Sequence, residues 1–423
     1  MLRLLAHRDF PFYTPKGAIP IGGGVRDLLL GRKPLDLDFA ALDPEGAAEE
    51  ARGRYGGTLF PLDRERGHYR LVAGGLSLDF TPLQGNLEED LLQRDYRLNA
   101  LIWIKGKVLG LPGTEEDLKR RHLVPVREEN LYQDHLRSLR GVRLAATLGL
   151  GLPQRTREAL ARHARFLREN PGALPARERV REELTRLLLS GRAPWGLHLL
   201  QRTGLLGVYL PELALLVGLD QGGVHHLPAW EHTLAVLFHL LWLWPEAPLE
   251  ARLAALYHDV GKPLTRRFDP EAGRYRFLGH AEVGAELARA ALSWLRFPKE
   301  TVERVAALVR RHMDRPPERA RALRRFYFRR RDLLPALPYL MAADRLAARG
   351  VEAEAWPLLE AYQEALKEPL PQRPLLSGEE VMALLGLEQG PGVGEALRVL
   401  LEAQAEGRVR TQEEARAFLQ HLP

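Results

Sequence analysis

Residues 19–40, which read IPIGGGVRDLLLGRKPLDLDFA, leave few folds open to the N-terminal part of this chain. The apolar residues 18–21 predict a strand that runs into three glycines at 22–24, where the missing side chains let backbone N–H groups approach a polyphosphate. Residues 25–30 predict a helix whose N-terminus favours negative charge, and residues 35–41 predict a second strand. This order of strand, glycine turn, helix and strand indicates a mixed α/β fold.

The second of these strands carries two aspartates, Asp36 and Asp38, whose side chains point to the same face. At about 7 Å apart along a strand, two carboxylates are unfavourable unless cations lie between them. Paired Mg²⁺ ions, bridged by carboxylates and substrate phosphates, are the usual arrangement for nucleotidyl transfer. Asp79, in the predicted strand 76–80, is a candidate third ligand.

The spacing of apolar residues changes at about residue 125. Before it, short apolar stretches at 68–72, 76–80 and 101–104 add to the strands already named. After it, apolar residues recur at helical spacing over 137–148, 179–189, 195–206, 230–244 and 281–295. The sequence therefore predicts an α+β protein, with a mixed α/β head followed by an all-helical remainder.

The composition limits the chemistry and the location of the protein. None of the 423 residues is cysteine, which excludes a thiolate nucleophile and Cys-ligated metals, so any metal must be held by His, Asp and Glu. The longest apolar run, 233–244, is too short to span a bilayer, and the first residues carry charges where a signal peptide is apolar. We therefore expect a cytoplasmic protein with no membrane partner.

Four histidines and two aspartates in the helical part form a second candidate metal site. His258 and Asp259 are adjacent and can bind one ion together only where a helix ends, and Gly261 with Pro263 predicts such an end. Imidazole-rich sites favour transition ions such as Ni²⁺, Mn²⁺ or Co²⁺ over Mg²⁺. In chain order the six residues are His232, His258, Asp259, His280, His312 and Asp344.

A helix around residues 134–143 is predicted to be amphipathic. Its apolar face would carry Leu139, Val142 and Ala146, and the opposite face Asp134, Arg137 and Arg140. Spacing alone suggests no more than a surface ion pair on that polar face.

The glycine turn with its two aspartates resembles motif A of the class II tRNA nucleotidyltransferase and bacterial poly(A) polymerase family, within the polymerase-β-like superfamily. Four further segments resemble this family in the same order, although Gln93 and Gln133 replace an Arg and a Glu of its motifs. The His/Asp pattern resembles the HD-domain metal-dependent phosphohydrolases. The four segments that resemble the nucleotidyltransferase and poly(A) polymerase family are LLQRDYRLNALIW (91–103), LYQDHLRSLRGVRLAATLG (131–149), ERVREELTRLL (178–188) and LLSGEEVMALLGLEQGPGVGEAL (375–397).

The resemblance implies roles for the matched residues. Asp36 and Asp38, with Asp79 beside them, would be catalytic and bind Mg²⁺, while Asp134 and Arg137 would select C or A at the base edge without a nucleic-acid template. The implied partners are the tRNA 3′ end and CTP, with ATP left open, and no DNA. The other residues implied to bind the nucleotide are Gly23, Arg26, Arg94, Asp95, Asn99, Arg140 and Arg143.

The same resemblance implies four domains: a nucleotidyltransferase head (1–125), a neck that recognises the base (126–208), an HD domain (209–350) and a C-terminal tRNA-binding region (351–423). In the HD domain the primary ion would bind His232, His258, Asp259 and Asp344, and His280 and His312 suggest a second ion. HD domains attached to this family are known for phosphatase and 2′,3′-cyclic phosphodiesterase activity.

A short connection narrows the expected activity. Between Thr81 and Leu87 the chain reads PLQGN, where a CCA-adding enzyme carries a longer mobile loop that lets it switch from C to A. Relatives without this loop add only the two cytidines, so we expect a CC-adding enzyme. The alternatives are a complete CCA-adding enzyme, a bacterial poly(A) polymerase, an HD phosphohydrolase whose head binds RNA, and a nonenzymatic RNA-binding scaffold.

Residues 318–332, ERARALRRFYFRRRD, interleave Arg with Phe326, Tyr327 and Phe328. Arg beside aromatic stacking groups fits RNA binding. A solvated basic helix with a buried aromatic face fits the same pattern, so both interpretations stay open.

Overall fold

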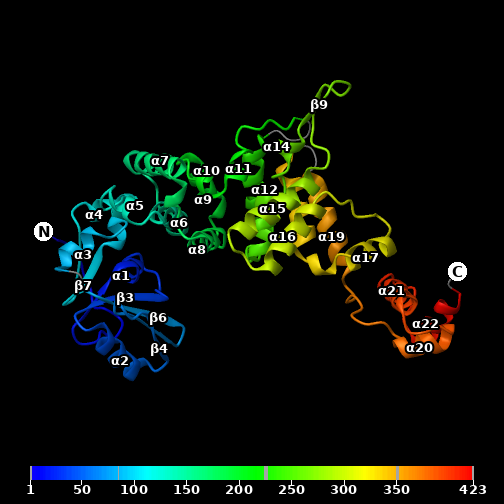
Figure 1. Cartoon of the computed structure of the whole chain (residues 1–423), viewed down its shortest axis with the longest axis horizontal. Helices are drawn as coiled ribbons and strands as arrows, with labels where there is room; N and C mark the ends of the chain where they lie inside the picture. The colour runs from blue at the N-terminus through cyan, green and yellow to red at the C-terminus, as the bar shows by residue number, and fades with distance from the viewer. Residues whose placement is uncertain (1, 84, 223–226, 349–351, 422–423) are drawn as a thin grey trace. The chain divides into compact units, whose positions relative to one another are not determined.

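The computed structural model describes residues 2–83, 85–222, 227–348 and 352–421. Contacts within the chain divide it into two compact units, Met1–Pro211 and Glu212–Pro423 (Figure 1). The division falls near the boundary predicted at 208/209 and keeps the predicted head and neck in one unit, and all the predicted domain boundaries stay predictions. In the described ranges every helix is too short or too polar to cross a bilayer.

An eight-stranded sheet forms the centre of the first unit. Its strands are β1 (Arg3–His7), β2 (Ala18–Ile21), β3 (Asp36–Ala41), β4 (Thr58–Asp63), β5 (His68–Ala73), β6 (Leu76–Pro82), β7 (Leu101–Ile104) and β8 (Lys107–Gly110). They lie in the order β1-β8-β7-β2-β3-β6-β5-β4, and of these neighbours only β3 and β6 run parallel. The five predicted strands are confirmed to within two residues at each end, whereas β1, β4 and β8 were not among the predictions.

Alternation along β3 and β6 gives the sheet an apolar face and a polar face. Leu37, Phe39, Leu78 and Phe80 are buried, and the rings of the two phenylalanines stack with centroids 5.1 Å apart. They form one core cluster with the alanines of α2 (Pro44–Tyr55). The residues between them must point to the other face of the sheet, which is the face where the aspartates lie.

α6 begins and ends where it was predicted, and Leu139, Val142 and Ala146 are fully buried. Of the other helices predicted in the first unit, 179–189 lies within two residues of the observed helix, 195–206 is observed to end four residues earlier, and the helix at 154–169 was not predicted. The helices are α1 (Gly22–Leu29), α3 (Leu87–Leu92), α4 (Thr114–Arg120), α5 (Asn130–Gln133), α6 (Arg137–Leu148), α7 (Gln154–Glu169), α8 (Arg177–Leu188), α9 (Ala193–Arg202) and α10 (Leu206–Tyr209), with 3₁₀ turns at Arg97–Asn99 and Pro171–Ala173.

The second unit is built mainly of helices (Figure 1). The helices predicted over 230–244 and 281–295 are present as α12 and α15, each shifted by one residue. The series is α11 (Pro211–Ala214), α12 (Ala229–Leu243), α13 (Leu249–Tyr257), α14 (Lys262–Thr265), α15 (His280–Trp294), α16 (Lys299–Arg311), α17 (Ala320–Phe328), α18 (Ala336–Ala347), α19 (Ala355–Ala365), α20 (Gly378–Leu385), α21 (Pro391–Ala405) and α22 (Gln412–Gln420), with 3₁₀ turns at Arg331–Leu333 and Glu352–Glu354.

The prediction that everything beyond residue 126 is helical is wrong at one place. β9 (Arg267–Asp269) and β10 (Arg274–Arg276) form an antiparallel hairpin in the second unit. At its turn Asp269 Oδ1 accepts a hydrogen bond from the Ala272 N–H, and Gly273 adopts a φ of +62° that favours glycine. Its residues are mainly polar and exposed, so the alternation of apolar residues that marks a half-buried strand is missing.

The Arg-rich segment forms α17, and its aromatic residues belong to the core. Phe326, Tyr327 and Phe328 are buried, which favours the interpretation as a basic helix with a buried aromatic face. Arg325 pairs with Glu406 at 2.6 Å and Arg329 with Glu402 at 2.7 Å, so these cations bind the C-terminal helices.

Candidate active site and metal centre

The polar face of the sheet brings the predicted aspartates together. In the sheet register, Asp38 of β3 lies beside Asp79 of β6, and Asp79 lies opposite Arg70 of β5. Asp36 shares the face of Asp38 because it is two residues away on the same strand. Arg70 donates through Nε and Nη2 to the two oxygens of Asp79, at 2.7 and 2.6 Å. This bidentate pair competes with metal binding by Asp79, whose role as a third ligand stays a prediction.

Asp38 lies against Gly22, the first residue of α1. A Cβ on Gly22 would lie 2.9 Å from Asp38 Oδ2 and 3.0 Å from Nη1 of Arg94, and Gly22 also has a φ of +76°. Burial raises the pKa of Asp38, and the charges of Asp79 and Asp36 add to this, while Arg94 and the Gly23 N–H oppose it. Crowded carboxylate oxygens of this kind fit a hard cation such as Mg²⁺.

The three glycines predicted as a turn before the helix instead form the first turn of α1, which begins at Gly22, three residues earlier than predicted. A Cβ on Gly24 would lie 2.8 Å from Leu37 Cδ2 and 2.9 Å from the carbonyl oxygen of Asp36. Gly24 is therefore needed for the close approach of α1 to β3, in addition to the phosphate approach expected of the turn.

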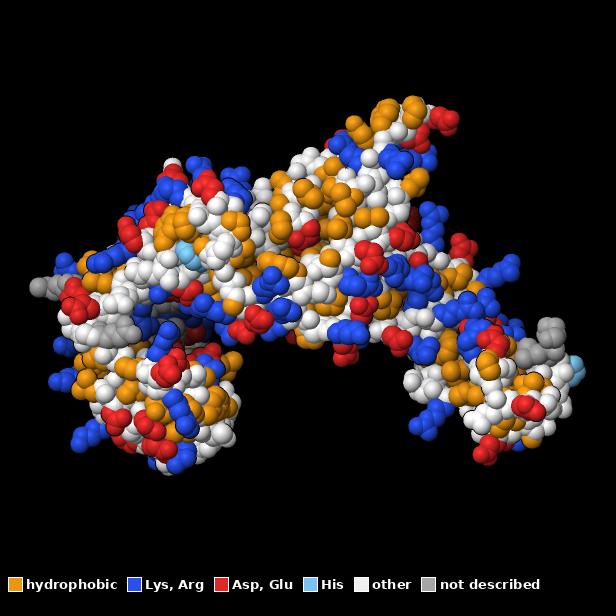
Figure 2. Space-filling view, viewed as in Figure 1, with side chains coloured by type: hydrophobic (Ala, Val, Ile, Leu, Met, Phe, Trp, Pro, Cys, Tyr) orange, Lys and Arg blue, Asp and Glu red, His pale blue; other side chains and the backbone are white. Residues whose placement is uncertain are grey.

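A cavity of about 790 Å³ opens over this face of the sheet, within the first unit. Figure 2 shows Lys and Arg side chains around a hollow in this part of the molecule. The predicted residues that line it are Gly23, Arg26, Asp36, Asp38, Asp79, Arg94, Asp95, Asn99, Arg137, Arg140 and Arg143. It also contains charged residues that were not predicted, namely Asp27, Arg32, Lys33, Arg70, Glu183 and Arg186.

A chain of hydrogen bonds connects α1 with the block of residues after α3. The guanidinium of Arg26 donates to Asn99 Oδ1 and also to Asp27 Oδ1, the latter from Nε at 2.9 Å. Asn99 Nδ2 donates to Asp95 Oδ1 at 2.9 Å, and Asp95 Oδ2 lies 3.6 Å from Arg140 Nη1. The network orients two cations, Arg26 and Arg140, at the cavity.

Helix α6 presents a row of arginines to the same cavity. Arg137, Arg140 and Arg143 follow at intervals of three residues and so share one side of the helix. Glu183 of α8, which is buried, accepts hydrogen bonds from Arg143 Nε at 2.6 Å and Arg140 Nε at 3.3 Å. Residues 178–188 resemble the family's helix that braces this element, and in the structure the Glu183 carboxylate makes the bracing contact with α6.

Asp134 lies elsewhere than predicted. It precedes α6 in an extended conformation, and its Oδ1 accepts from the Leu136 N–H at 3.2 Å. Arg179 donates to its Oδ2 at 2.9 Å, so the ion pair within one helix that spacing suggested is instead a pair between segments. Asp134 is absent from the residues that line the cavity, and no helical face presents it beside Arg137.

The second unit gathers all six predicted residues of the HD pattern. α13 ends at Tyr257, so the helix stop predicted at Gly261 and Pro263 is confirmed in position to within a few residues. His232 comes from α12, Asp344 from α18, His280 from the start of α15, and His312 from the end of α16.

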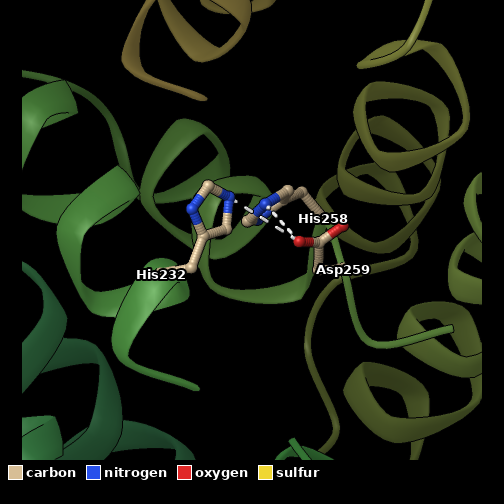
Figure 3. A group of neighbouring side chains, drawn as sticks. All are labelled: His232, His258 and Asp259. Carbon is tan, nitrogen blue, oxygen red and sulfur yellow. Dashed lines mark ion pairs between the residues drawn. The ribbon is translucent and has the colours of Figure 1, made fainter. Parts of the chain in front are cut away.

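Asp259 lies between two groups of histidines. Its Oδ2 lies 3.1 Å from His258 Nε2 and 3.7 Å from His232 Nε2 (Figure 3). Its Oδ1 lies 3.5 Å from His280 Nε2 and 3.9 Å from His312 Nε2. Asp344 Oδ1 joins the first group, 3.0 Å from His232 Nε2. Each group has three ligand atoms close enough to hold one metal ion, and Asp259 belongs to both groups, while the two predicted ions stay a prediction.

Three of the rings are held in the same manner. Nδ1 of His258, His280 and His312 each lies within hydrogen-bonding distance of the carbonyl oxygen three residues earlier, at 2.9, 2.7 and 2.6 Å. In the neutral ring with Nδ1–H donated to that carbonyl, Nε2 carries the lone pair on the side of Asp259, and a hydrogen bond of this kind commonly orients histidines that bind metal. Nε2 of His280 and Nε2 of His312 lie 3.3 Å apart, so two lone pairs face each other and a cation fits between the groups.

The electrostatics of the HD site differ from ring to ring: burial lowers the pKa of His258 but the charge of Asp259 outweighs it and raises that pKa, whereas burial prevails at His312. Burial lowers the pKa of His312 to about 4, chiefly because the ring has lost its solvent. Burial raises the pKa of Asp259, but His258 and Lys262 outweigh it and hold the pKa well below its usual range. Lys262 Nζ lies 2.6 Å from Asp259 Oδ2, a buried contact that the sequence analysis missed.

Arg70 could have been found from the sequence. The dipeptide Gly74-Gly75 between two predicted strands is a hairpin signal, and the resulting register pairs Arg70 with Asp79. Glu183 and Lys262 carry no such signal, because their partners depend on how whole helices pack.

Comparisons with known proteins identify two family matches within the chain and several relatives of nearly its whole length. Residues 229–349 match the HD domain family, and residues 149–216 match the family described as "Probable RNA and SrmB- binding site of polymerase A". The chain is 79% identical to the CC-adding tRNA nucleotidyltransferase of Thermus thermophilus, covering 98% of this chain and 96% of that one. It is 48% identical to the A-adding tRNA nucleotidyltransferase of Deinococcus radiodurans, over 96% and 95% of the two chains.

Among solved structures, the crystal structure of the Bacillus stearothermophilus CCA-adding enzyme in complex with CTP is similar in fold. Its TM-score is 0.68 at 24% identity, over 95% of this chain and 92% of that one. The mixed α/β head and the helical body with its HD domain agree with this likeness, as predicted. On these grounds the chain belongs to the tRNA nucleotidyltransferase family.

Proposed function

We propose that this protein is a CC-adding enzyme, which transfers two cytidylates from CTP to the 3′ end of tRNA without a nucleic-acid template. The observation that carries the proposal is the placement of Asp36 and Asp38 on one strand, facing an Arg-rich cavity beside the glycine turn. In the reaction the tRNA 3′-oxygen bonds to the α-phosphorus of CTP, and the bond to pyrophosphate breaks.

The chain supplies the charges that such a transfer needs. Asp36 and Asp38 would hold Mg²⁺, which when bound favours deprotonation of the 3′-hydroxyl and stabilises departing pyrophosphate. Arg26, Arg94 and Arg140 line the cavity and would bind the phosphates through planar two-pronged contacts. Arg26 and Arg140 are already oriented through Asn99 and Asp95, so little side-chain entropy is lost on binding.

Arg137 would contact the base edge from α6, because it lines the cavity and donates to the Asn130 carbonyl oxygen at 3.0 Å. Asp134 would join it only if its carboxylate turned from Arg179 toward the cavity. The proposal that Asp134 helps to select the base therefore includes breaking of the ion pair between Asp134 and Arg179 when the nucleotide binds.

Two observations support CC addition over complete CCA addition. The 79% identical relative is named as CC-adding, and β6 ends at Pro82 only a few residues before α3 begins at Leu87. Of that connection, Gln84 lies outside the described residues. Addition of A is the second candidate, because a relative of 48% identity is named as A-adding.

The test uses one tRNA prepared without CCA, with one C, and with CC. With CTP alone we expect two, one and no added nucleotides respectively, and with ATP alone no addition to any of them. Extension of the CC-ended tRNA by ATP would overturn the CC-only assignment in favour of an A- or CCA-adding enzyme, and long A-tails on a generic RNA would indicate a poly(A) polymerase.

Asp38→Asn tests the site itself. It should abolish incorporation, whereas Asp43→Asn should retain it, because Asp43 caps α2 by accepting from the Gly46 N–H and Asn caps a helix equally well. Full incorporation by Asp38→Asn would refute the assigned catalytic strand.

We also propose that the HD site is a phosphohydrolase centre holding transition ions such as Ni²⁺, Mn²⁺ or Co²⁺ and acting on phosphates at RNA 3′ ends. The support is the pair of ligand groups around Asp259 with their anchored imidazoles. His258→Ala should lose phosphohydrolase activity and bound metal while CC addition continues. Loss of both activities would contradict two separable centres.

A further inference from the structure

Beside the HD ligands lies a second cavity, of about 530 Å³, within the second unit. Asp259, His280 and Asp344 reach it from the candidate metal site. Lys262, Arg274 and Arg315 bring positive charge to the same cavity. A cavity lined by candidate metal ligands and by several cationic side chains suits an anionic ligand such as a phosphate.

Arg274 belongs to the β9–β10 hairpin, which projects from the helices of the second unit (Figure 1). The projection carries both hydrophobic and cationic side chains in Figure 2. On one of its faces Tyr275 packs edge-on against Phe268, with centroids 5.4 Å apart, and the guanidinium of Arg266 lies 3.7 Å from the Tyr275 ring centroid. Both rings are exposed, Phe268 to 58% and Tyr275 to 37%.

The hairpin holds its own shape. In the strand register Tyr275 lies opposite Phe268, and Arg274 lies opposite Asp269. Arg276 forms an ion pair with the Asp269 carboxylate at 2.5 Å. Arg274, Tyr275 and Arg276 of β10 line the cavity, while Arg267 of β9 belongs to the same hairpin and does not. The strand that faces the metal ligands is therefore also the strand that carries exposed cations and an aromatic ring.

We infer that the β9–β10 hairpin, together with Arg315, is a docking surface for single-stranded RNA, which guides a 3′-terminal phosphate to the HD site. The inference rests on the phosphohydrolase part of the proposed function. Exposed Arg supplies the phosphate contacts and exposed aromatic rings supply stacking for bases, the two elements of sequence-tolerant binding to single strands. The 3′ end of the RNA enters the cavity, and the preceding nucleotides lie along β10.

The probe is an eight-nucleotide RNA with a 5′ fluorescein and a 3′ phosphate, bound to the full chain in EDTA so that no hydrolysis occurs. Anisotropy should show that Arg274→Gln weakens binding about three- to tenfold and lowers the slope of log Kd against log salt by about 0.7, the value for one lost contact to a single strand. Arg267→Gln is the matched control, with the same charge loss on the same hairpin outside the cavity, and should change Kd less than twofold.

A second readout locates the RNA directly. The same oligonucleotide with 4-thiouridine next to its 3′ end should crosslink on irradiation to residues 267–278, as mapped by mass spectrometry. CC addition by Arg274→Gln should equal wild type, because the hairpin lies outside the transferase unit. Crosslinks found only in residues 1–211, or equal affinity losses in the two variants, would overturn the inference.

Failure of the inference and failure of the phosphohydrolase proposal are distinguishable. If the wild-type chain removes the 3′ phosphate but Arg274→Gln binds RNA unchanged, the hairpin is not the docking surface and the HD proposal stands. If crosslinks map to the hairpin but no phosphate is released with Ni²⁺, Mn²⁺ or Co²⁺ present, the HD proposal fails and the docking surface stands.

Discussion

Replacing Glu183 with Gln removes a buried negative charge that Arg140 and Arg143 share. Glu183 is 4% exposed, and its carboxylate accepts hydrogen bonds from Arg140 and Arg143 at 3.3 and 2.6 Å. Gln has nearly the same shape, so the change tests charge and not packing. Without the carboxylate, two cations on the same helix face a neutral partner.

Breaking a fully buried ion pair costs about 3–5 kcal/mol. Here the arginine side chains retain 33% and 16% exposure toward the cavity, so water screens part of the loss and we expect about 2–3 kcal/mol. For a unit of this size each kcal/mol lowers the midpoint by about 2–4 °C, which gives a decrease of about 4–12 °C.

Calorimetry of the full chain, with hydrogen–deuterium exchange of peptides from α6 and α8 to identify which unit melts, measures this effect. Glu182→Gln is the control, because Glu182 is the exposed neighbour on the same helix and should change stability by less than about 0.5 kcal/mol. Equal melting of the two variants, with unchanged exchange in α6, would refute the reasoning that Glu183 stabilises the arginine row.

Three further predictions concern the first unit. Gly24→Ala should destabilise it by about 1–3 kcal/mol in calorimetry because the new Cβ meets backbone and side-chain atoms at under 3.0 Å, whereas Gly53→Ala, which meets nothing within 4 Å, should be neutral or stabilising. Burial, aided by the neighbouring His135, lowers the pKa of His163 from 6.5 to about 4, so as the pH falls the unfolded chain takes up a proton before the folded chain does. The free energy of unfolding, measured by urea titration, should therefore be full above pH 6.5 and about 2 kcal/mol lower at pH 5. The decrease should be smaller in His163→Gln. Arg70→Gln should release Asp79 as a metal ligand and lower the Mg²⁺ concentration at half-maximal CC addition; an unchanged midpoint would contradict competition between that pair and the metal.

The parts of the fold that could be predicted are those marked by a local period. Asp36 and Asp38 alternate with buried residues on β3, so the face they share follows from strand geometry. α6 was predicted with correct ends because its apolar residues recur at helical spacing along its whole length. The exposed hairpin has no such period and was missed.

Local composition predicted less about partners. The arginines of α17 suggested RNA, yet Arg325 and Arg329 pair with glutamates of the C-terminal helices. Asp134 was expected beside Arg137 on one helix, and instead Arg179 holds it. These partners are far away in the sequence, and no spacing rule within a single helix can identify them.

The three anchored imidazoles of the HD site have a consequence for how it takes up metal. Rotation of any of these rings would break an N–H···O=C hydrogen bond at a helix end, so the directions of the metal-binding nitrogens are fixed once the helices have folded. The geometry of the site would therefore change little when a metal ion binds. Discrimination among ions would then depend on ionic radius and preferred coordination geometry. Removal of the metal by a chelator would leave Nε2 of His280 and Nε2 of His312 close together with no cation between them. The start of α15 and the end of α16, which carry these histidines, should therefore become more mobile before any other part of the second unit.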